Sequence, residues 1–190
     1  MIKKEITLAV SGDEGSFSEE AGLLYCSREG VEGILTYAID MEGVLLRVES
    51  GEVERGIFPV VNSRGGLVQT ALEAMGRHPF ALQDELWLEV QQCLLTLSGT
   101  ERGQITQIVS HPQAISQCER YLRREFPAVQ LIEWEDTAKA ARDLANGVLQ
   151  KTTAVIAPAR AAVLYGLEIL ERGIQDSRPN LTTFIIVSKL

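Results

Sequence analysis

The chain alternates short apolar runs with stretches whose apolar residues recur at helical spacing. Runs such as Ile6 to Val10, Ile105 to Val109 and Ala154 to Ala157 have the length and composition of buried strands. The stretches between such runs predict helices at residues 19–27, 43–52, 67–75, 114–126, 137–149 and 159–172. Strands that alternate with helices in this way are typical of an α/β fold rich in parallel strands.

Two segments punctuated by glycine and proline divide the chain. Residues 76–83 form the first, and Leu86 to Leu97 after it is predicted to be extended. Residues 173–179 form the second, followed by a predicted closing strand from Thr182 to Val187. The predicted organisation is a first lobe made of residues 1–78 and 177–190, with residues 79–176 inserted as a second lobe.

Polar turns follow several of the apolar runs. Ser110-His111-Pro112-Gln113-Ala114 has its proline near the first helical position, where the missing N–H has no consequence. Free N–H groups and the helix dipole at such a junction attract a carboxylate. Similar turns occur at residues 11–18, 62–66, 136–137 and 158. Ordinary helix capping explains any one of them, but several together indicate a polar cleft at the carboxyl ends of the strands.

The composition limits the kinds of molecule that the chain is expected to bind. A chain of 190 residues that is 45% hydrophobic can bury a sizeable core. Twenty-six acidic and eighteen basic residues give a net charge of −8, which argues against a nucleic-acid partner. No apolar stretch approaches the roughly twenty residues that span a bilayer, and the first residues lead directly into a strand pattern. We expect neither nucleic acid nor membrane as a partner.

The cysteines and histidines do not form a recognisable metal or disulfide pattern. Cys26, Cys93 and Cys118 lack CxxC spacing, and His78 and His111 lie far apart in the sequence. Free cysteines are most often buried apolar residues. We therefore expect no metal, no disulfide framework, and a reduced, cytoplasmic setting.

Several motifs together resemble one known family. They occur in the family's order over nearly the whole chain, which makes the signal specific. On these motifs the chain resembles the catalytic domain of prephenate dehydratases: Gly12 to Ser18, Pro59 to Ser63 with Gly66, Ser110 to Ala114 with Gln117 and Cys118, Thr137-Ala138 with Ala140-Ala141, Tyr165 to Leu167, Ile174 to Asp176, Asn180, and Thr182 to Phe184.

The resemblance implies a two-lobed, periplasmic-binding-protein-like (type II) fold with a ligand cleft between the lobes. It implies a homodimer that converts prephenate, a small dicarboxylate, to phenylpyruvate with loss of water and carbon dioxide and without a cofactor. Family members often carry a C-terminal ACT domain that senses phenylalanine. Because the chain ends at Leu190, directly after the closing strand, we expect no such regulator here.

The resemblance also implies roles for individual residues. The family assigns proton donation to the threonine of its Thr-Arg-Phe motif, a position that Thr182 occupies; a β-branched residue suited to a strand is the alternative interpretation of Thr182. His111 is expected to order its turn, and Asn180 to form one. The expected substrate-binding residues are Asn62, Ser63, Arg64, Ser110, His111, Gln113, Ala114, Thr137, Thr183 and Phe184.

Three positions depart from the family pattern. Thr183 stands where the family has an arginine that would hold a substrate carboxylate, Val61 where Pro-Ile-Glu-Asn-Ser has glutamate, and Gln92 where histidine is common. Arg64 stands where the family usually has a small hydroxyl residue. One hypothesis is that Arg64 replaces the missing arginine as a carboxylate clamp; the alternative is that it points to solvent.

Two classes of function fit these observations. The first is a lyase, either a prephenate dehydratase or a relative that decarboxylates prephenate without expelling its hydroxyl. The second is a non-catalytic binding module for a dicarboxylate metabolite. The presence of Thr182 and of the whole Ser110 to Ala114 motif favours the lyase.

Overall fold

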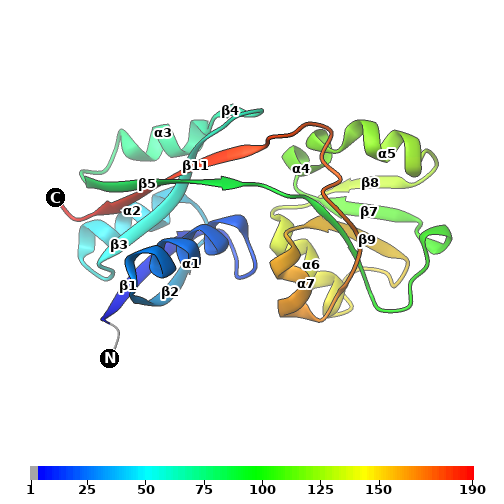
Figure 1. The fold of residues 1–190 in the computed structure, drawn as a ribbon, viewed down its shortest axis with the longest axis horizontal. Coiled ribbons are helices and arrows are strands. Elements are labelled where there is room, and N and C mark those ends of the chain that lie inside the picture. The colour runs from blue at the N-terminus through cyan, green and yellow to red at the C-terminus, as the bar shows by residue number, and fades with distance from the viewer. Residues whose placement is uncertain (1–3) are drawn as a thin grey trace. The chain divides into compact units, whose positions relative to one another are not determined.

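The computed structural model describes residues 4–190 and shows a mixed α/β fold (Figure 1). The chain divides into two compact units: unit 1 contains the described residues up to Glu89 together with Pro179–Leu190, and unit 2 is Val90–Arg178. The first boundary predicted from the sequence, at residue 79, is misplaced. Residues Ala81–Glu89 form a strand, β5, that pairs with the closing strand of unit 1 along its length.

Unit 1 is built on one mixed sheet in the order β2-β1-β3-β11-β5, with β4 paired to β3. The parallel part contains β1, β2 and β3, and β11 runs antiparallel to both β3 and β5. The bounds are β1 Glu5–Ser11, β2 Glu32–Ala38, β3 Arg55–Asn62, β4 Gly66–Leu67 and β11 Leu181–Ser188.

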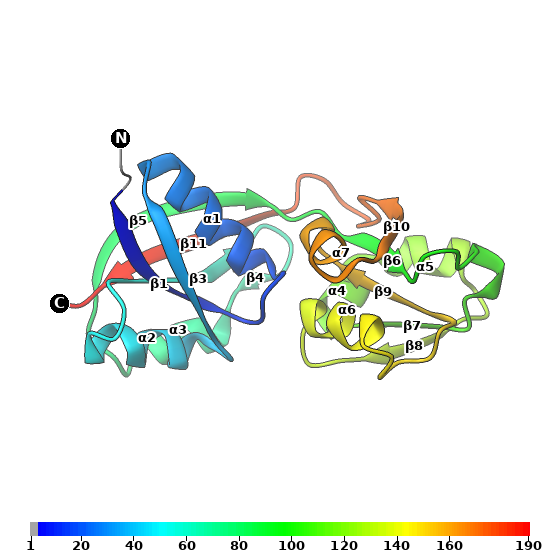
Figure 2. The ribbon, with the colours of Figure 1, turned by 90° about the horizontal axis from the view of Figure 1, so that it is seen from below.

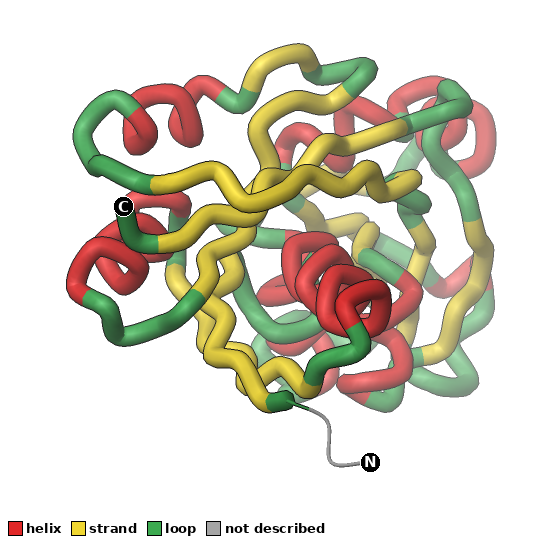
Figure 3. The backbone as a smooth tube through the Cα atoms, turned by 60° about the vertical axis from the view of Figure 1, so that its left-hand side comes forward, coloured by secondary structure: helices red, strands yellow, loops and turns green. Residues whose placement is uncertain are grey.

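Helices cover both faces of this sheet, as Figures 2 and 3 show. Helix α1, Phe17–Glu29, packs Ala21 and Tyr25 on the face that carries Phe184. Helices α2, Met41–Ser50, and α3, Gln69–Met75, pack on the opposite face, which carries Ile185. The approach of α2 requires Gly56 on β3, because a Cβ atom there would lie 2.6 Å from a methyl carbon of Val44.

Unit 2 has the same three layers around a second mixed sheet, in the order β10-β6-β9-β7-β8. Helices α6 and α7 pack with one apolar cluster, and α4 and α5 with the other. The bounds are β6 Cys93–Thr96, a 3-10 turn Arg102–Gln104, β7 Gln107–Ser110, α4 Pro112–Gln117, α5 Glu119–Glu125, β8 Gln130–Glu133, α6 Thr137–Ala145, β9 Thr153–Ala157, α7 Ala159–Tyr165 and β10 Glu168–Arg172.

Two predicted helices and the predicted strand orientation differ from the structure. The helix predicted at 159–172 ends at Tyr165, because Gly166 takes a left-handed conformation with φ 66°, and β10 follows, antiparallel to β6. The helix predicted at 114–126 is divided at Cys118. The sheets are mixed because β5, β6, β10 and β11, which flank the two passages between the units, each make antiparallel pairs.

His78 joins the turn after α3 to helix α2. Its Nε2 lies 2.6 Å from Glu42 and its Nδ1 2.8 Å from Glu49. The hydrogen bonds to these two carboxylates raise the pKa of His78 above its ordinary 6.5. Arg77 and His78 in turn lower the pKa of Glu42 to about 2. The pKa of Arg77 is raised, chiefly by its hydrogen bond to Glu42 and also by the nearby charges of Glu73 and Asp40.

We therefore expect the contribution of His78 to be fully present below pH 6.5 and lost as the pH rises through its raised folded-state pKa. The contribution of Glu42 to stability is present above pH 4.5 and is lost as the pH falls toward about 2, its pKa in the folded state. Urea unfolding midpoints between pH 6 and 9 should fall less in His78→Gln, which cannot gain the charge. Equal falls in the two proteins would contradict this assignment.

Candidate functional site

The ends of β3 and β11 bring Asn62 and Thr182 together in unit 1. The two residues are directly opposite in the antiparallel register, although 120 positions separate them in the sequence. Asn62 Nδ2 donates a hydrogen bond of 2.8 Å to Thr182 Oγ1 and one of 2.9 Å to Asn180 Oδ1. All three side chains are buried, with exposed fractions of 7% or less. This pair of strand ends is the candidate reactive part of the site.

The side-chain carbonyl oxygen of Asn62 holds the turn that follows β3. Asn62 Oδ1 accepts hydrogen bonds from the backbone N–H groups of Arg64 and Gly65, each at 2.8 Å. An asparagine amide offers two donor hydrogens and a carbonyl oxygen with two lone pairs, and all four are used here. Asn62 was expected to bind substrate. Its side chain makes hydrogen bonds to Thr182, to Asn180 and to the turn after β3.

The Asn62 contact leaves the hydroxyl of Thr182 with its own hydrogen to donate. A threonine hydroxyl combines one donor with acceptor lone pairs, and Asn62 occupies an acceptor position. A hydrogen bond donated to the oxygen also stabilises negative charge that develops on it when its proton leaves. The geometry therefore suits Thr182 to give a proton to a leaving group, the role expected from its motif.

The two residues after Asn62 tie the turn to the segment that leads into β11. The backbone N–H of Ser63 donates to the Leu181 carbonyl at 2.8 Å, and the N–H of Leu181 donates to Ser63 Oγ at 2.9 Å. Arg64 is exposed, and its Nε donates to the Pro179 carbonyl at 3.3 Å. The guanidinium of Arg64 is thus held against the segment that carries Asn180 and Thr182.

Thr183 does not share a sheet face with Thr182. Side chains alternate along a strand, and Thr182 is on the α1 face with Phe184. Thr183 is on the other face, directly opposite Val61 on β3 and Trp87 on β5. Phe184 itself is only 1% exposed and packs in the core cluster under α1. Its expected contact with substrate is therefore corrected to a core role.

In unit 2, Ser110, His111 and the backbone of the Ser110 to Ala114 motif form hydrogen bonds with neighbouring groups of the protein. The fully buried Ser110 hydroxyl donates to the Ile156 carbonyl at 2.6 Å and so joins β7 to β9. His111 Nδ1 accepts from the N–H of Gln113, and the His111 carbonyl accepts from the N–H of Ala114. Ala114 is 3% exposed and packs in the core, whereas Gln113 is exposed. A substrate contact through the Ala114 side chain is therefore corrected to a core contact.

The starts of α4 and α6 do not offer the free N–H groups that the sequence suggested. Helix α4 has six residues, begins with a proline, and has its first two N–H donors satisfied by His111. Thr137 begins α6, where Asp136 Oδ1 accepts from the N–H groups of Ala138 and Lys139. Capping, the alternative considered for each junction, is what these side chains do.

Gln92 belongs to a cluster of three glutamines in unit 2, of which Gln92 and Gln175 are buried and Gln117 is half-buried. Its backbone N–H donates to Gln175 Oε1 at 3.1 Å, and its Nε2 donates to Gln117 Oε1 at 3.2 Å. Gln92 is 3% exposed, and its Oε1 has no hydrogen-bond partner among the residues the structure describes. The cluster fixes the two segments through which the chain enters and leaves unit 2. Gln117 and Asn180 belong to the motifs that carry the resemblance but were not among the expected site residues. Their contacts with Gln92 and Asn62 depend on the tertiary fold.

Residues 4–190 contain no group of three or more His, Cys, Asp or Glu side chains placed to hold a metal ion. The three cysteines are free and buried, and burial raises the pKa of the Cys118 thiol. Within the same residues, every helix is too short or too polar to cross a membrane.

Comparisons with known proteins identify relatives of this chain. A family model described as prephenate dehydratase matches residues 8–190. Arogenate dehydratase/prephenate dehydratase 6 of Arabidopsis thaliana is 36% identical over 190 residues, which are 100% of this chain and 45% of that protein. The chain spans about half the length of the curated relatives it matches.

Solved structures show the same fold. The prephenate dehydratase of Arthrobacter aurescens, in complex with L-phenylalanine, is 25% identical with a TM-score of 0.86, over 97% of this chain and 61% of that one. A lipoprotein of Bacillus subtilis described as methionine-binding is similar in fold alone, at 12% identity and a TM-score of 0.51, over 98% of this chain and 84% of that one. The fold is therefore two-lobed and periplasmic-binding-protein-like, and the chain belongs to the prephenate dehydratase family.

Proposed function

We propose that this chain is a lyase that converts prephenate to phenylpyruvate. The observation that carries the proposal is the hydrogen bond from Asn62 to Thr182, which leaves the buried hydroxyl of Thr182 with a hydrogen to donate. In the reaction the C4–O bond of the ring breaks and the hydroxyl leaves with one added proton as water. The ring carboxylate leaves as carbon dioxide, and its bonding electron pair completes the aromatic ring.

The two residues have separate tasks in this reaction. Thr182 passes its proton to the departing hydroxyl as the C4–O bond breaks. Asn62 Nδ2 then stabilises the negative charge left on Thr182 Oγ1, which recovers a proton from water. General acid assistance of this kind contributes about a hundredfold to ten-thousandfold in rate. Aromatisation supplies the driving force, so this step requires no cofactor.

Arg64 is the residue we propose to bind a carboxylate of the substrate. Its backbone is held by Asn62 and its Nε by the Pro179 carbonyl, so the guanidinium stays beside the segment that leads to Thr182. Both carboxylates of prephenate are ionised at neutral pH, and an arginine fork suits either one.

Arg64→Ala is therefore expected to raise KM for prephenate about 10- to 100-fold, the equivalent of roughly 1.5–3 kcal/mol, with a smaller change in kcat. Steady-state kinetics measure both constants. Arg55→Ala, which removes an arginine from the other end of β3, is the matched control. An unchanged KM in Arg64→Ala would show that the guanidinium only faces solvent.

The test of the function is to incubate the purified chain with prephenate near neutral pH and to separate the products. Phenylpyruvate supports the proposal, and Thr182→Val provides the blank for spontaneous reaction. A non-aromatic dihydro product would instead identify a decarboxylase that retains the hydroxyl. Measurable binding without turnover would identify a binding module.

Arogenate is the second substrate to assay, because the names of several similar plant proteins include it. It differs from prephenate by an ammonium group in place of the side-chain ketone, so the same two bonds break and phenylalanine forms. The ratio of kcat/KM for the two compounds assigns the substrate.

A homodimer and a cytoplasmic location are also part of the proposal. Membership of the family supports the first, and the three free, buried cysteines are compatible with a reducing compartment. Light scattering of the purified chain tests the dimer, and fractionation of the native cells tests the location.

A further inference from the structure

Two buried atoms of the glutamine cluster in unit 2 have no hydrogen-bond partner among the residues that the structure describes. They are the acceptor Gln92 Oε1 and the donor Gln175 Nε2. Both side chains are more than nine-tenths buried, with exposed fractions of 3% and 7%. Buried polar atoms in native proteins nearly always have a partner, which can be a bound molecule. An orphan acceptor and an orphan donor in one cluster therefore indicate a polar ligand.

The neighbouring groups fix which atom of each amide is free. The backbone N–H of Gln92 can only donate, so the Gln175 atom 3.1 Å from it is the oxygen, and Nε2 is at the other end of the amide. Gln92 Nε2 donates to Gln117 Oε1 at 3.2 Å, which leaves the Gln92 oxygen for a ligand. The cluster thus offers one acceptor together with a donor that carries two hydrogens.

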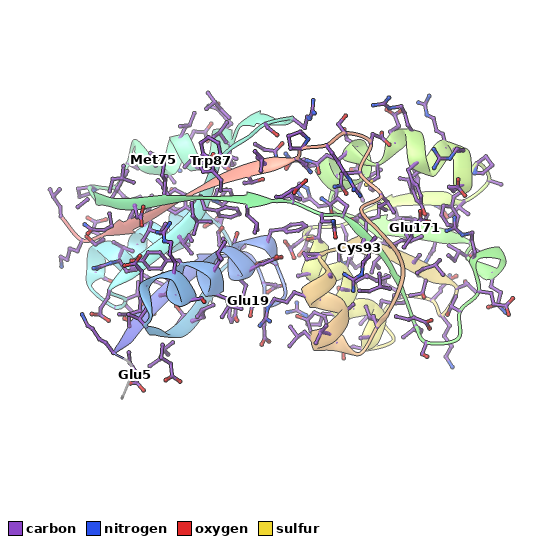
Figure 4. The ribbon with its side chains drawn as sticks, viewed as in Figure 1. Glu5, Glu19, Met75, Trp87, Cys93 and Glu171 are labelled. Atoms are coloured by element: carbon purple, nitrogen blue, oxygen red, sulfur yellow. The ribbon has the colours of Figure 1, made fainter. Side chains whose placement is uncertain are left out.

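Backbone contacts hold these two residues without using their free atoms. The N–H of Ile174 donates to the Gln92 carbonyl at 3.0 Å, and Cys93 on β6 pairs with Arg172 on β10. Figure 4 labels Cys93, the residue after Gln92, where the strand that enters unit 2 meets the segment that leaves it. A site built on two paired segments keeps its donor and acceptor in place before a ligand arrives.

An acceptor and a donor in one cluster suit the amino-acid end of a small molecule, because an ammonium group only donates and a carboxylate only accepts. We propose that Gln92 Oε1 accepts a hydrogen bond from the ammonium group of arogenate and that Gln175 Nε2 donates to its side-chain carboxylate. The identity of this ligand rests on the proposed function. Prephenate has a ketone in place of the ammonium group, and a ketone only accepts. Gln92 is therefore the residue that distinguishes the two compounds, whereas Gln175 binds the group they share.

The kinetic test uses Gln92→Met, which removes the acceptor but keeps the backbone contacts of residue 92 with Gln175 and Ile174. We expect kcat/KM for arogenate to fall about tenfold to a hundredfold, while the value for prephenate stays within about threefold and shows that the variant is folded. Gln175→Glu keeps an oxygen for the N–H of residue 92 but loses the amide hydrogens. It should raise KM for both compounds about tenfold or more. Gln130→Met, which changes an exposed glutamine on β8 of the same unit, is the matched control and should stay within about twofold.

L-phenylalanine and phenylpyruvate, the products expected from arogenate and prephenate, carry the same two side-chain ends and test the site without turnover. In titration calorimetry, Gln92→Met should weaken phenylalanine binding about tenfold or more and leave phenylpyruvate binding within about threefold. Equal losses for the two compounds, or none, would overturn the assignment and leave Gln92 Oε1 with no more than a water molecule. Failure of the unmodified chain to bind phenylalanine would overturn it as well. A chain that converts neither substrate but binds phenylalanine through Gln92 would refute the proposed function and support the site.

Discussion

Thr182→Val is expected to lower kcat with prephenate by about a hundredfold to ten-thousandfold, the range of a lost general acid, while KM changes little. Valine has nearly the shape of threonine, so the strand pairing with β3 and β5 should persist. The substitution removes only the hydroxyl that accepts from Asn62 and that we propose donates to the leaving group. Stopped or continuous absorbance assays of phenylpyruvate formation measure the loss.

Serine at the same position provides the matched control. Thr182→Ser keeps the hydroxyl but loses the methyl group that restricts its rotation, so we expect a loss of only about tenfold or less. Urea unfolding of both variants separates a chemical effect from a structural one. If Thr182→Val retained most of its activity at unchanged stability, the proton would have to come from another group.

The periodicity of apolar residues was sufficient to predict most of the helices and strands. It failed at residues 168–172, where Glu168-Ile169-Leu170-Glu171-Arg172 fits either a helix or a strand edge. The structure resolves the ambiguity through contacts distant in sequence. Glu168 and Arg172 pair with Thr96 and Cys93 of β6, and Glu171 accepts a hydrogen bond from Tyr121 of α5. Only the tertiary fold selects the strand.

The same limit applies to the site. The motifs identified Thr182 and Asn62 as separate residues, but the hydrogen bond between them depends on the register of two strands 120 positions apart. Register also pairs Val61 with Thr183, two departures that read as independent losses in the sequence. The sequence correctly predicted polar residues at the helix starts. It did not predict that the side chains of His111 and Asp136 themselves accept hydrogen bonds from the backbone N–H groups there.

Asn62→Asp is expected to reverse the direction of the hydrogen bond at Thr182. The new side chain has almost the same shape, and either of its oxygens can still accept from the N–H groups of Arg64 and Gly65. The oxygen that replaces Nδ2, however, has no hydrogen when the carboxyl is ionised. It must then accept the proton of Thr182 and also face the Oδ1 atom of Asn180. We expect kcat to fall about a hundredfold or more, because the proton required for water to leave is held by the carboxylate.

The pH dependence of Asn62→Asp separates this explanation from simple disruption. Burial favours the neutral carboxyl, which can donate to Thr182 Oγ1 as the amide does, so activity relative to the unmodified chain should rise as the pH falls. Asn62→Ala has no group to protonate and should show no such recovery. It should also lose about 2–4 kcal/mol of stability, since it removes the four hydrogen bonds of the Asn62 side chain. If the ratio of Asn62→Asp activity to that of the unmodified chain stays constant from pH 5 to 8, Asn62 only supports the turn. If the ratio rises at low pH, the direction of the hydrogen bond between residue 62 and Thr182 controls proton donation by Thr182.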